Sequence, residues 1–372
     1  MRELCSSYPS RVAQAQALND TAPKGVRNVT PVVDTISGVA FISVIVCSHN
    51  PRPDCLRRTL NSIKGQTLGR DHWELVVVDN GSNTSLSDTC DLSWHRCARH
   101  VREEELGLTL ARLRAIAESR GELLVFVDDD NVLASGFLEE ASTIHDQYPF
   151  LGVFGAGSLE PDFEIHPPPE IRSRLGLLAL RSILEARWSN NVRDVESIPW
   201  GAGLCVSRRV ADAYALLVNG FGSKVIAVLG RRGSELFSGE DDIFSWVAAS
   251  VGLGFGVFPQ LQLTHLISAD RLSRSYFLRL IHDHTVSHSV RQYMLTGTRP
   301  RSIDALRYVH LLLHGVRNGR FSMQCQWAES RGEDDARRLI RQEQLRPVEL
   351  RDFVDADLAP SVVVGPNELP HP

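Results

Sequence analysis

The chain has 372 residues, of which 45 are Asp or Glu and 40 are Lys or Arg, so its formal net charge is -5. Hydrophobic residues make up 43% and charged residues 23%, an ordinary globular composition that excludes wholesale disorder and collagen-like repeats. The length suits two domains, or one large α/β domain with appendages. The mildly acidic balance gives no support for a general nucleic-acid binder.

The 7 cysteines have no C-x-x-C spacing, which argues against a zinc ribbon and, in so long a chain, against a disulfide scaffold. We therefore expect reduced thiols in a cytoplasmic protein. Residues 1–20 contain no apolar run of the kind that a secretory signal needs. The longest uncharged stretch, 243–269, is interrupted by glycines and a proline, and predicts a helix end, a turn and a strand rather than a membrane span.

Residues 1–40 show no sustained apolar period and predict a poorly structured lead-in, with a partner-binding arm as the alternative.

After this lead-in, the first half of the chain alternates strands with helices. The alternation implies right-handed crossovers and a mostly parallel sheet. Short apolar runs predict strands over 41–47, 73–78 and 123–127, and helical spacing predicts helices over 55–68 and 108–119.

The second half of the chain is less regular, and its pattern predicts more helix than strand. Residues 197–206 are expected to lead into a short strand, and residues beyond about 332 to form a peripheral helix and a tail. The other expected elements are helices over 175–188, 273–295 and 303–314, a loop entering a helix over 235–249, and a strand over 255–265.

Polar residues follow each of the three early strands. Ser48 and Asn50 follow the first, Asp79 the second, and an acidic run begins at Asp128 after the third. Because ligands of parallel sheets bind beyond the carboxyl ends of the strands, these residues are expected to share one site.

Three adjacent carboxylates, Asp128, Asp129 and Asp130, make up that acidic run. Their repulsion is relieved by a hard divalent cation such as Mg²⁺ or Mn²⁺, which prefers carboxylate oxygens and shares its shell with phosphates. The alternative is a solvated acidic turn. Asp79 likewise either caps the turn after its strand or accepts a hydrogen bond from a nucleotide. Taken with Ser48 and its neighbours, it favours a nucleotide pocket.

Several motifs in this order resemble family 2 glycosyltransferases of the GT-A fold, over about residues 41–295. Gly107 and Arg112 occur between the second and third strand motifs, His265 follows the late strand, and Arg271 begins a downstream pattern that bacterial members share. The motifs are VIVCSHN at 44–50, LNSIKGQT at 60–67, ELVVVDNGS at 74–82, FVDDD at 126–130, PWGAG at 199–203 and SGEDD at 238–242.

The resemblance implies a GT-A sheet flanked by helices, formed by residues 41–295 with a nucleotide-sugar half to 160 and an acceptor half from 161. Residues 296–372 would be a helical extension and tail. It also implies a hexosyltransferase-type enzyme that uses Mn²⁺ or Mg²⁺ and inverts the anomeric centre in one displacement. Asp241 would be the general base, Glu240 would orient the acceptor, and Asp130 with His265 would bind the metal. The implied nucleotide-sugar residues are Ser48, Asn50, Asp79, Arg112, Asp128 and Asp129, and the acceptor-side residues are Trp200, Gly201 and Ala202.

Two departures from the family pattern affect these roles. The family often has Thr-Tyr-Asn where this chain has Ser48-His49-Asn50, and an Asn where it has Leu113 beside Arg112.

The loop at 229–234, with two arginines between glycines, either closes over a diphosphate or stays solvated. The i, i+4 pair His284 and His288, like His282 on the same expected helix, favours a surface or substrate-side face over a second metal site.

The expected partners are a nucleoside diphosphate sugar, with a UDP-sugar favoured, and a sugar or lipid-linked acceptor in surface polysaccharide or glycolipid synthesis. The alternatives are a non-catalytic sugar-nucleotide-binding protein of the same fold and a sugar nucleotidyltransferase. The last would need a Gly-rich phosphate loop near the start of the domain, which residues 48–52 do not provide. The helices expected over 273–314 mix arginines with apolar residues, so they either rest on the inner face of an anionic membrane or pack on the domain.

Overall fold

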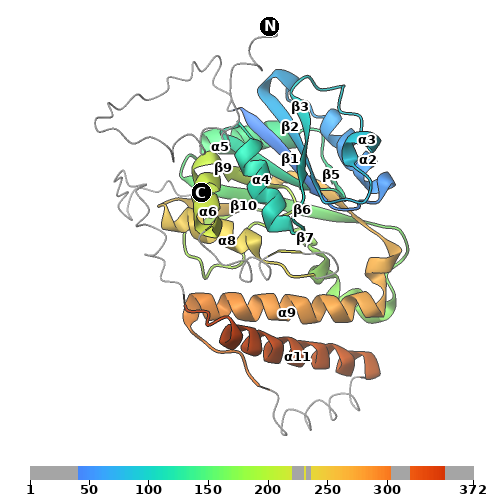
Figure 1. The fold of residues 1–372 in the computed structure, drawn as a ribbon, viewed down its shortest axis with the longest axis vertical. Helices are drawn as coiled ribbons and strands as arrows, with labels where there is room; N and C mark the ends of the chain where they lie inside the picture. The colour runs from blue at the N-terminus through green and yellow to red at the C-terminus, as the bar shows by residue number, and fades with distance from the viewer. Residues whose placement is uncertain (1–40, 220–229, 232–235, 303–318, 348–372) are drawn as a thin grey trace.

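The computed structural model describes residues 41–219, 230–231, 236–302 and 319–347 (Figure 1). The expected lead-in over 1–40, the expected helix over 303–314 and the end of the tail lie outside these described residues, as does most of the 229–234 loop. Within the described ranges the protein is an α/β fold with a mixed sheet and a helical C-terminal region, as the sequence predicts.

One sheet organises the fold, in the order β3-β2-β1-β4-β9-β6-β10-β5. The four neighbouring strands β3, β2, β1 and β4 are parallel, as expected for the three of them that the sequence predicts, whereas β9 runs antiparallel to both β4 and β6, and β5 runs antiparallel to β10. Because β10 also pairs in parallel with β6 along most of its length, the prediction of a mostly parallel sheet is confirmed, and β9 and the short strand β5 are antiparallel exceptions. The strands are β1 (Ile42–Ser48), β2 (Trp73–Asn80), β3 (Ala98–Glu103), β4 (Leu123–Asp128), β5 (Asn131–Leu133), β6 (Leu151–Phe163), β7 (Arg181–Ser182), β8 (Arg187–Ser189), β9 (Leu204–Ser207) and β10 (Gly254–Ile267).

Helices cover both faces of this sheet because successive side chains of a strand point to opposite faces. Val44 and Val46 of β1 join a core with α2 (Pro53–Lys64) and α5 (Phe137–Gln147), whereas Ile45 faces the other core. That second core contains the apolar faces of α4 (Leu108–Glu118), α6 (Arg208–Asn219) and α8 (Glu240–Ser250). The polar strand ends are thus held by a backbone buried on both sides.

The expected helix over 175–188 is wrong. A 3-10 helix, η2, spans Pro169–Leu178 and ends where Ala179 adopts a positive φ of 55°. The chain then adds β7 to β6 and β8 to β10. Only the start of the expected helix is therefore helical, as part of a 3-10 helix. The residues that follow form short strands that pair with β6 and β10. The strands β3 and β6 and the helices α5 and α6 are likewise not predicted from the sequence.

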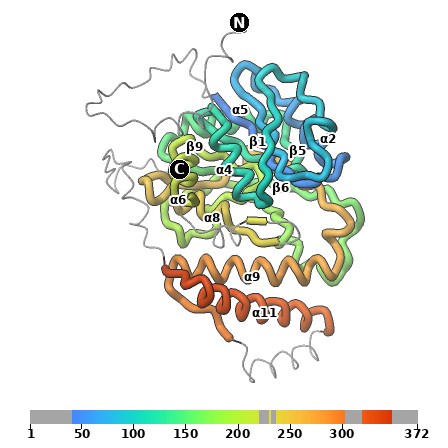
Figure 2. The backbone as a smooth tube through the Cα atoms, in the orientation of Figure 1, coloured from blue at the N-terminus to red at the C-terminus, as the bar shows by residue number. Residues whose placement is uncertain are grey.

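Two long helices, α9 (Arg274–Thr296) and α11 (Arg320–Gln342), pack side by side next to the α/β body (Figures 1 and 2). Phe277 and Leu280 of α9 are buried against η2 and β10, while Val290 packs against α11. The apolar face of α9 therefore packs on protein, which is the second of the two alternatives given for it. Among the described helices, none combines the length and apolar character that a bilayer crossing requires.

Candidate active site

The carboxyl ends of β1, β2 and β4 meet at one edge of the sheet. Ser48 lies opposite Asp79 in the β1–β2 register, and Cys47 lies opposite Asp128 in the β1–β4 register. The polar residues that follow the three strands are thereby neighbours, as their sequence positions predict.

Ser48 and Asp129 form a direct contact, in which the Ser48 hydroxyl donates to Asp129 Oδ2. Burial raises the pKa of Asp129 to about 7, and the charge of Asp130 adds to the rise, while the hydrogen bond from Ser48 opposes it. Burial and the neighbouring charge of Asp130 therefore favour the neutral form of the Asp129 carboxyl.

Asp130 faces His265 of β10, and their Oδ2 and Nε2 atoms are 3.4 Å apart. Arg271 Nη1 donates to Asp130 Oδ2 over 2.6 Å and lies 3.0 Å from His265 Nε2. Burial alone would raise the pKa of Asp130, but the hydrogen bond and charge of His265 and the charge of Arg271 hold it well below its usual range. A positive group thus already occupies the space between the two side chains.

These two side chains fit a divalent cation. Ligands at adjacent corners of an octahedron, each about 2.1 Å from the metal, lie about 3.0 Å apart, close to the observed separation of Asp130 and His265. The Nδ1 atom of His265 is buried without a hydrogen-bond partner. Within the described ranges no third His, Cys, Asp or Glu completes a cluster, so water and substrate oxygens would supply the remaining ligands.

Asp79 makes several contacts inside the protein. Its Oδ1 accepts from the Ser82 N–H at 3.0 Å, and its Oδ2 accepts from the Leu86 N–H at 3.1 Å and from Arg102 Nη1 at 2.7 Å. Although burial opposes it, these hydrogen bonds lower the pKa of Asp79 below its usual value. The side chain therefore caps the turn after β2, which is the first of the two alternatives given for it, and Asp79 is 2% exposed.

Asn50 links the loops that follow β1 and β2. It has a positive φ of 46°, its N–H donates to Ser82 Oγ at 2.9 Å, and its Oδ1 accepts from the Asn83 N–H at 2.9 Å. Asn50 also borders a cavity of about 660 Å³ between α2 and the segment that leads to Trp94.

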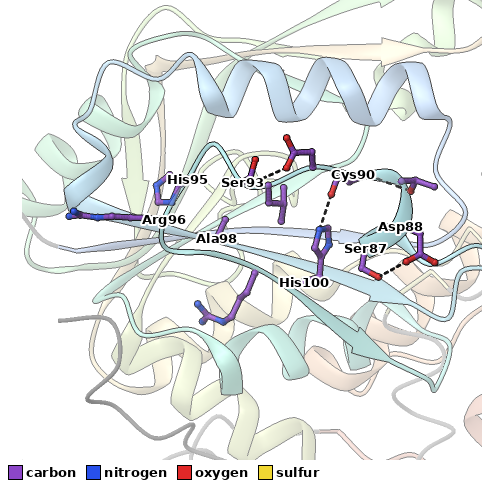
Figure 3. Close-up of a pocket in the computed structure, with 12 residues that line it drawn as sticks. Ser87, Asp88, Cys90, Ser93, His95, Arg96, Ala98 and His100 are labelled. Carbon is purple, nitrogen blue, oxygen red and sulfur yellow. Dashed lines mark hydrogen bonds between the residues drawn. The ribbon is translucent and has the colours of Figure 1, made fainter. Parts of the chain in front are cut away.

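A second cavity, of about 710 Å³, lies on the other side of that segment beside the edge strand β3 (Figure 3). His100 lines it and contacts the Cys90 carbonyl oxygen at 3.0 Å. Because this cavity contains none of the predicted site residues, it is separate from the active-site edge of the sheet.

Arg112 and Glu240 form one buried pair, a relationship that the sequence interpretation does not anticipate. Arg112 Nη1 lies 3.2 Å from Glu240 Oε2, and Tyr214 donates to Glu240 Oε1 at 2.5 Å. Burial raises the pKa of Glu240, and the charge of Arg112 opposes the rise. Both side chains lie beneath the site, with 4% and 3% of their surfaces exposed. A pair separated by 128 positions leaves no local pattern in a sequence.

Asp241, next along α8, contacts the acceptor-side segment. Its Oδ2 accepts from the Gly201 N–H at 3.1 Å. Trp200 stacks beneath the guanidinium of Arg181, whose carbon is 3.9 Å from the ring centroid. Burial lowers the pKa of Arg181 to about 10, while the charge of Asp241 raises it, so Arg181 adds a cation to this part of the site. Arg181 is missed from the sequence because it falls inside the wrongly expected helix. Ala202, the last of the expected acceptor-side residues, is buried.

Of the 229–234 loop only Gly230 and Arg231 are described. The Arg231 carbonyl oxygen accepts from the Leu108 N–H at 2.9 Å, at the start of α4. The positive charge of Arg231 also lowers the pKa values of Asp129 and Asp130. This loop therefore brings at least one arginine to the acidic run.

Comparison with known proteins gives a family match for part of the first half of the chain. Residues 43–188 match the family described as Glycosyl transferase family 2. The chain is 29% identical over 97 residues to Glycosyltransferase AglE of Haloferax volcanii, across 25% of this chain and 32% of AglE. It is 28% identical over 104 residues to the putative teichuronic acid biosynthesis glycosyltransferase TuaG of Bacillus subtilis, across 27% of this chain and 40% of TuaG.

Each of these matches spans less than half of the curated relative's own length. Among solved structures, the mannosyltransferase PcManGT from Pyrobaculum calidifontis, in complex with GDP-Man and Mn²⁺, is 16% identical. That likeness has a TM-score of 0.49 and covers 89% of this chain and 93% of that one.

Proposed function

We propose, from the premise that this chain carries a glycosyltransferase domain of family 2, that it moves a sugar from a nucleoside diphosphate sugar to an acceptor hydroxyl with inversion. The observation that carries the proposal is the pair Asp130 and His265. The two residues come from different segments at the edge of the sheet where β4 ends, and they hold a positive guanidinium between them. A site built to hold positive charge there suits the diphosphate of a sugar nucleotide.

The donor would lie across the ends of β1, β2 and β4. Ser48 and Asn50 would line the nucleotide side of the donor, and Asp79 would lie beside its nucleobase. Asp128 and Asp129 would lie toward the ribose and diphosphate. Arg112 would act from below, because it is buried against Glu240 and its charge adds to the positive potential of the site. A UDP-sugar is the proposed donor.

Asp130 and His265 would hold Mn²⁺ or Mg²⁺. When bound, the cation neutralises the charge that develops on the departing nucleoside diphosphate. The loop containing Arg231 would add further positive charge near the same phosphates.

Asp241 would take the proton of the acceptor hydroxyl. The acceptor oxygen forms its bond to the anomeric carbon as the bond from that carbon to the diphosphate oxygen breaks, and the proton goes to the Asp241 carboxylate. General base catalysis of this kind contributes roughly 10²–10⁴-fold. Trp200, Gly201 and Ala202 would border the acceptor, and Glu240 would hold the start of α8 in place through Arg112 and Tyr214.

We further propose that residues 41–295 act as the catalytic domain, with residues 296–372 as an extension. The acceptor would be a sugar or lipid-linked precursor of a surface polysaccharide or glycolipid, handled in the cytoplasm. An inner-face membrane contact would not involve Phe277 or Leu280, which are buried.

The test is a panel of UDP-, GDP- and dTDP-sugars, each measured by thermal shift and by nucleoside diphosphate release, with and without Mn²⁺. A ligand at 100 times its dissociation constant adds about 2.7 kcal/mol to the unfolding free energy. We expect one nucleotide class to stabilise the protein only with the metal present, and the product sugar to have the opposite anomeric configuration by NMR. Failure of every nucleotide to bind, or retention of configuration, would contradict the proposal.

A further inference from the structure

We propose that Arg291 of α9 is a positioning residue for Asp241, which makes the pair of helices α9 and α11 part of the catalytic apparatus. The inference rests on the proposed function, because it takes Asp241 as the base. Arg291 does not touch the proposed acceptor segment; it acts on the backbone that carries Asp241.

The segment before α8 is fastened to one stripe of α9. The Leu236 N–H donates to Asp283 Oδ2 at 2.9 Å, and the Ser238 N–H donates to Ser287 Oγ at 3.1 Å. Arg291 Nη1 donates to the Ser238 carbonyl oxygen. Asp283, Ser287 and Arg291 follow at intervals of four residues, so they line one face of the helix. Side chains of α9 thus hydrogen-bond the backbone of the 236–238 segment, as a neighbouring strand would do in a sheet.

Arg291 then crosses the turn at Gly239 to reach the first turn of α8. Its Nε lies 2.5 Å from Asp242 Oδ2, and Arg291 as a whole is 9% exposed. Gly239 has a φ of 127°, and a Cβ there would overlap the Arg291 guanidinium. The turn therefore requires glycine both for its backbone conformation and for the passage of this arginine.

Asp241 lies between two residues that are each held from the protein side. Glu240 is buried against Arg112 and Tyr214, and Asp242 is paired with Arg291. Asp241 itself points to the Gly201 N–H. Releasing Arg291 would free one of these two anchors, and a catalytic group displaced by about 1 Å can cost roughly 10² in rate.

The second helix keeps the first in place. His282 Nε2 of α9 lies 3.0 Å from Asp335 Oδ2 of α11, and a Cβ on Gly332 of α11 would lie 2.7 Å from the His282 carbonyl oxygen. The two helix backbones are therefore in close contact opposite the stripe that holds the 236–242 segment. Arg291 belongs to a helix whose arginines and apolar residues could suit a membrane surface, but its side chain is instead buried and paired with Asp242.

The experiment compares the full-length Arg291→Met and Arg291→Lys variants with the matched control Arg279→Met, which removes an exposed arginine from the same helix. Hydrogen exchange of peptides covering 199–203 and 236–242 needs no substrate. Steady-state kinetics use whichever sugar nucleotide of the UDP, GDP and dTDP panel the wild-type protein turns over.

We expect faster exchange in both peptides for Arg291→Met, by roughly tenfold, because Asp241 no longer protects the Gly201 amide. kcat should fall by roughly 10- to 100-fold, while the donor KM stays within about twofold. Arg291→Lys retains the charge beside Asp242 but has no guanidinium fork, so it should recover part of kcat. Should Arg291→Met not fold, the Lys variant carries the same kcat-against-KM comparison.

Unchanged exchange at 199–203, or a kcat equal to that of Arg279→Met, overturns the positioning role. If Asp241→Asn abolishes transfer while Arg291→Met retains full kcat, only this inference fails. If Asp241→Asn transfers normally, the proposed base is wrong, and the exchange of the 199–203 peptide still decides whether Arg291 holds Asp241 in place.

Discussion

Arg271 donates a hydrogen bond of 2.6 Å to Asp130, at the point where the proposed metal ligands converge. The same nitrogen lies 3.0 Å from His265 Nε2, and the Arg271 side chain is 14% exposed. The guanidinium thus balances the charge of a carboxylate that is itself largely buried. A divalent cation that binds Asp130 and His265 must displace it, so Arg271 and the metal compete for one place.

Replacing Arg271 by Met should therefore tighten Mn²⁺ binding in the absence of nucleotide. The variant removes both the competing hydrogen bonds and the repulsion between two cations, and a tenfold gain corresponds to about 1.4 kcal/mol. Mn²⁺ titration followed by electron paramagnetic resonance measures the change, with Arg274→Met as the control because Arg274 pairs with Glu170 at the surface. Weaker Mn²⁺ binding by Arg271→Met than by the control would show that the arginine assists the metal.

Asp130→Asn should abolish the Mn²⁺-dependent stabilisation by nucleoside diphosphate, because an amide is a far weaker ligand for a hard cation. It also leaves Arg271 without its anionic partner, so stability should fall by about 1–3 kcal/mol. The double variant Asp130→Asn with Arg271→Met removes both charges and should regain much of that stability without regaining the metal effect. Thermal shift with UDP or GDP, with and without MnCl₂, reads both; a retained Mn²⁺ effect would refute the assignment of Asp130.

The contact between α9 and α11 should weaken as pH rises. His282 contacts Asp283 Oδ1 at 2.8 Å and Asp335 Oδ2 at 3.0 Å, and Arg338 lies 3.5 Å from Asp335. The hydrogen bond that His282 donates to Asp283 is the largest cause that raises the pKa of His282, while burial opposes the rise. A raised pKa in the folded state adds stability below the unfolded value of about 6.5, and this stability is lost as pH rises through the folded value.

His282→Gln should consequently lower stability at about pH 5.5, by roughly 1–2 kcal/mol, and have little effect near pH 8.5. Urea unfolding of both proteins at the two pH values measures the difference. A loss of stability that is equal at both pH values would mean that the imidazole acts here through packing alone.

Gly332→Ala in α11 should destabilise the protein although alanine is the better helix former by about 1 kcal/mol. The new Cβ would lie 2.7 Å from the His282 carbonyl oxygen and 2.8 Å from Thr285 Cβ, so the helices must separate, at a cost of roughly 1–3 kcal/mol beyond the propensity gain. Gly136→Ala is the control, because a Cβ there meets nothing within 4 Å. A more stable Gly332→Ala protein in urea unfolding would show that the two backbones are further apart.

The parts of the fold that the sequence predicts are those with strong local patterns. The buried runs of β1, β2 and β4 are continuous and apolar, and α9 begins and ends within one residue of its expected bounds. The region around Arg181 is wrong because a short 3-10 helix and edge strands share the leucine spacing of an α-helix. Local periodicity also gives no information on whether β9 runs parallel or antiparallel to β4.

The candidate site likewise contains some residues whose positions the sequence predicts and others whose positions it does not. Residues at strand ends, such as Ser48 and Asp79, are brought together as their positions predict. Partners from distant segments are not predictable from one sequence: the contacts of Arg112 with Glu240 and of Arg291 with Asp242 depend on tertiary packing alone. Glu240 shows the consequence, since a motif position expected to face the acceptor is buried beneath the site.

The most direct test of the proposed chemistry is the comparison of transfer kinetics and donor binding for Asp241→Asn. The amide oxygen can still accept from the Gly201 N–H, so the contact at 3.1 Å is retained while the ability to take a proton is lost. We predict that transfer to acceptor falls by roughly 10²-fold or more, while binding of the sugar nucleotide with Mn²⁺ changes by less than about twofold. If Asp241 only caps α8, its replacement costs about 1 kcal/mol of stability and turnover persists. Turnover within a few-fold of the wild-type rate would contradict the assignment of Asp241 as the base.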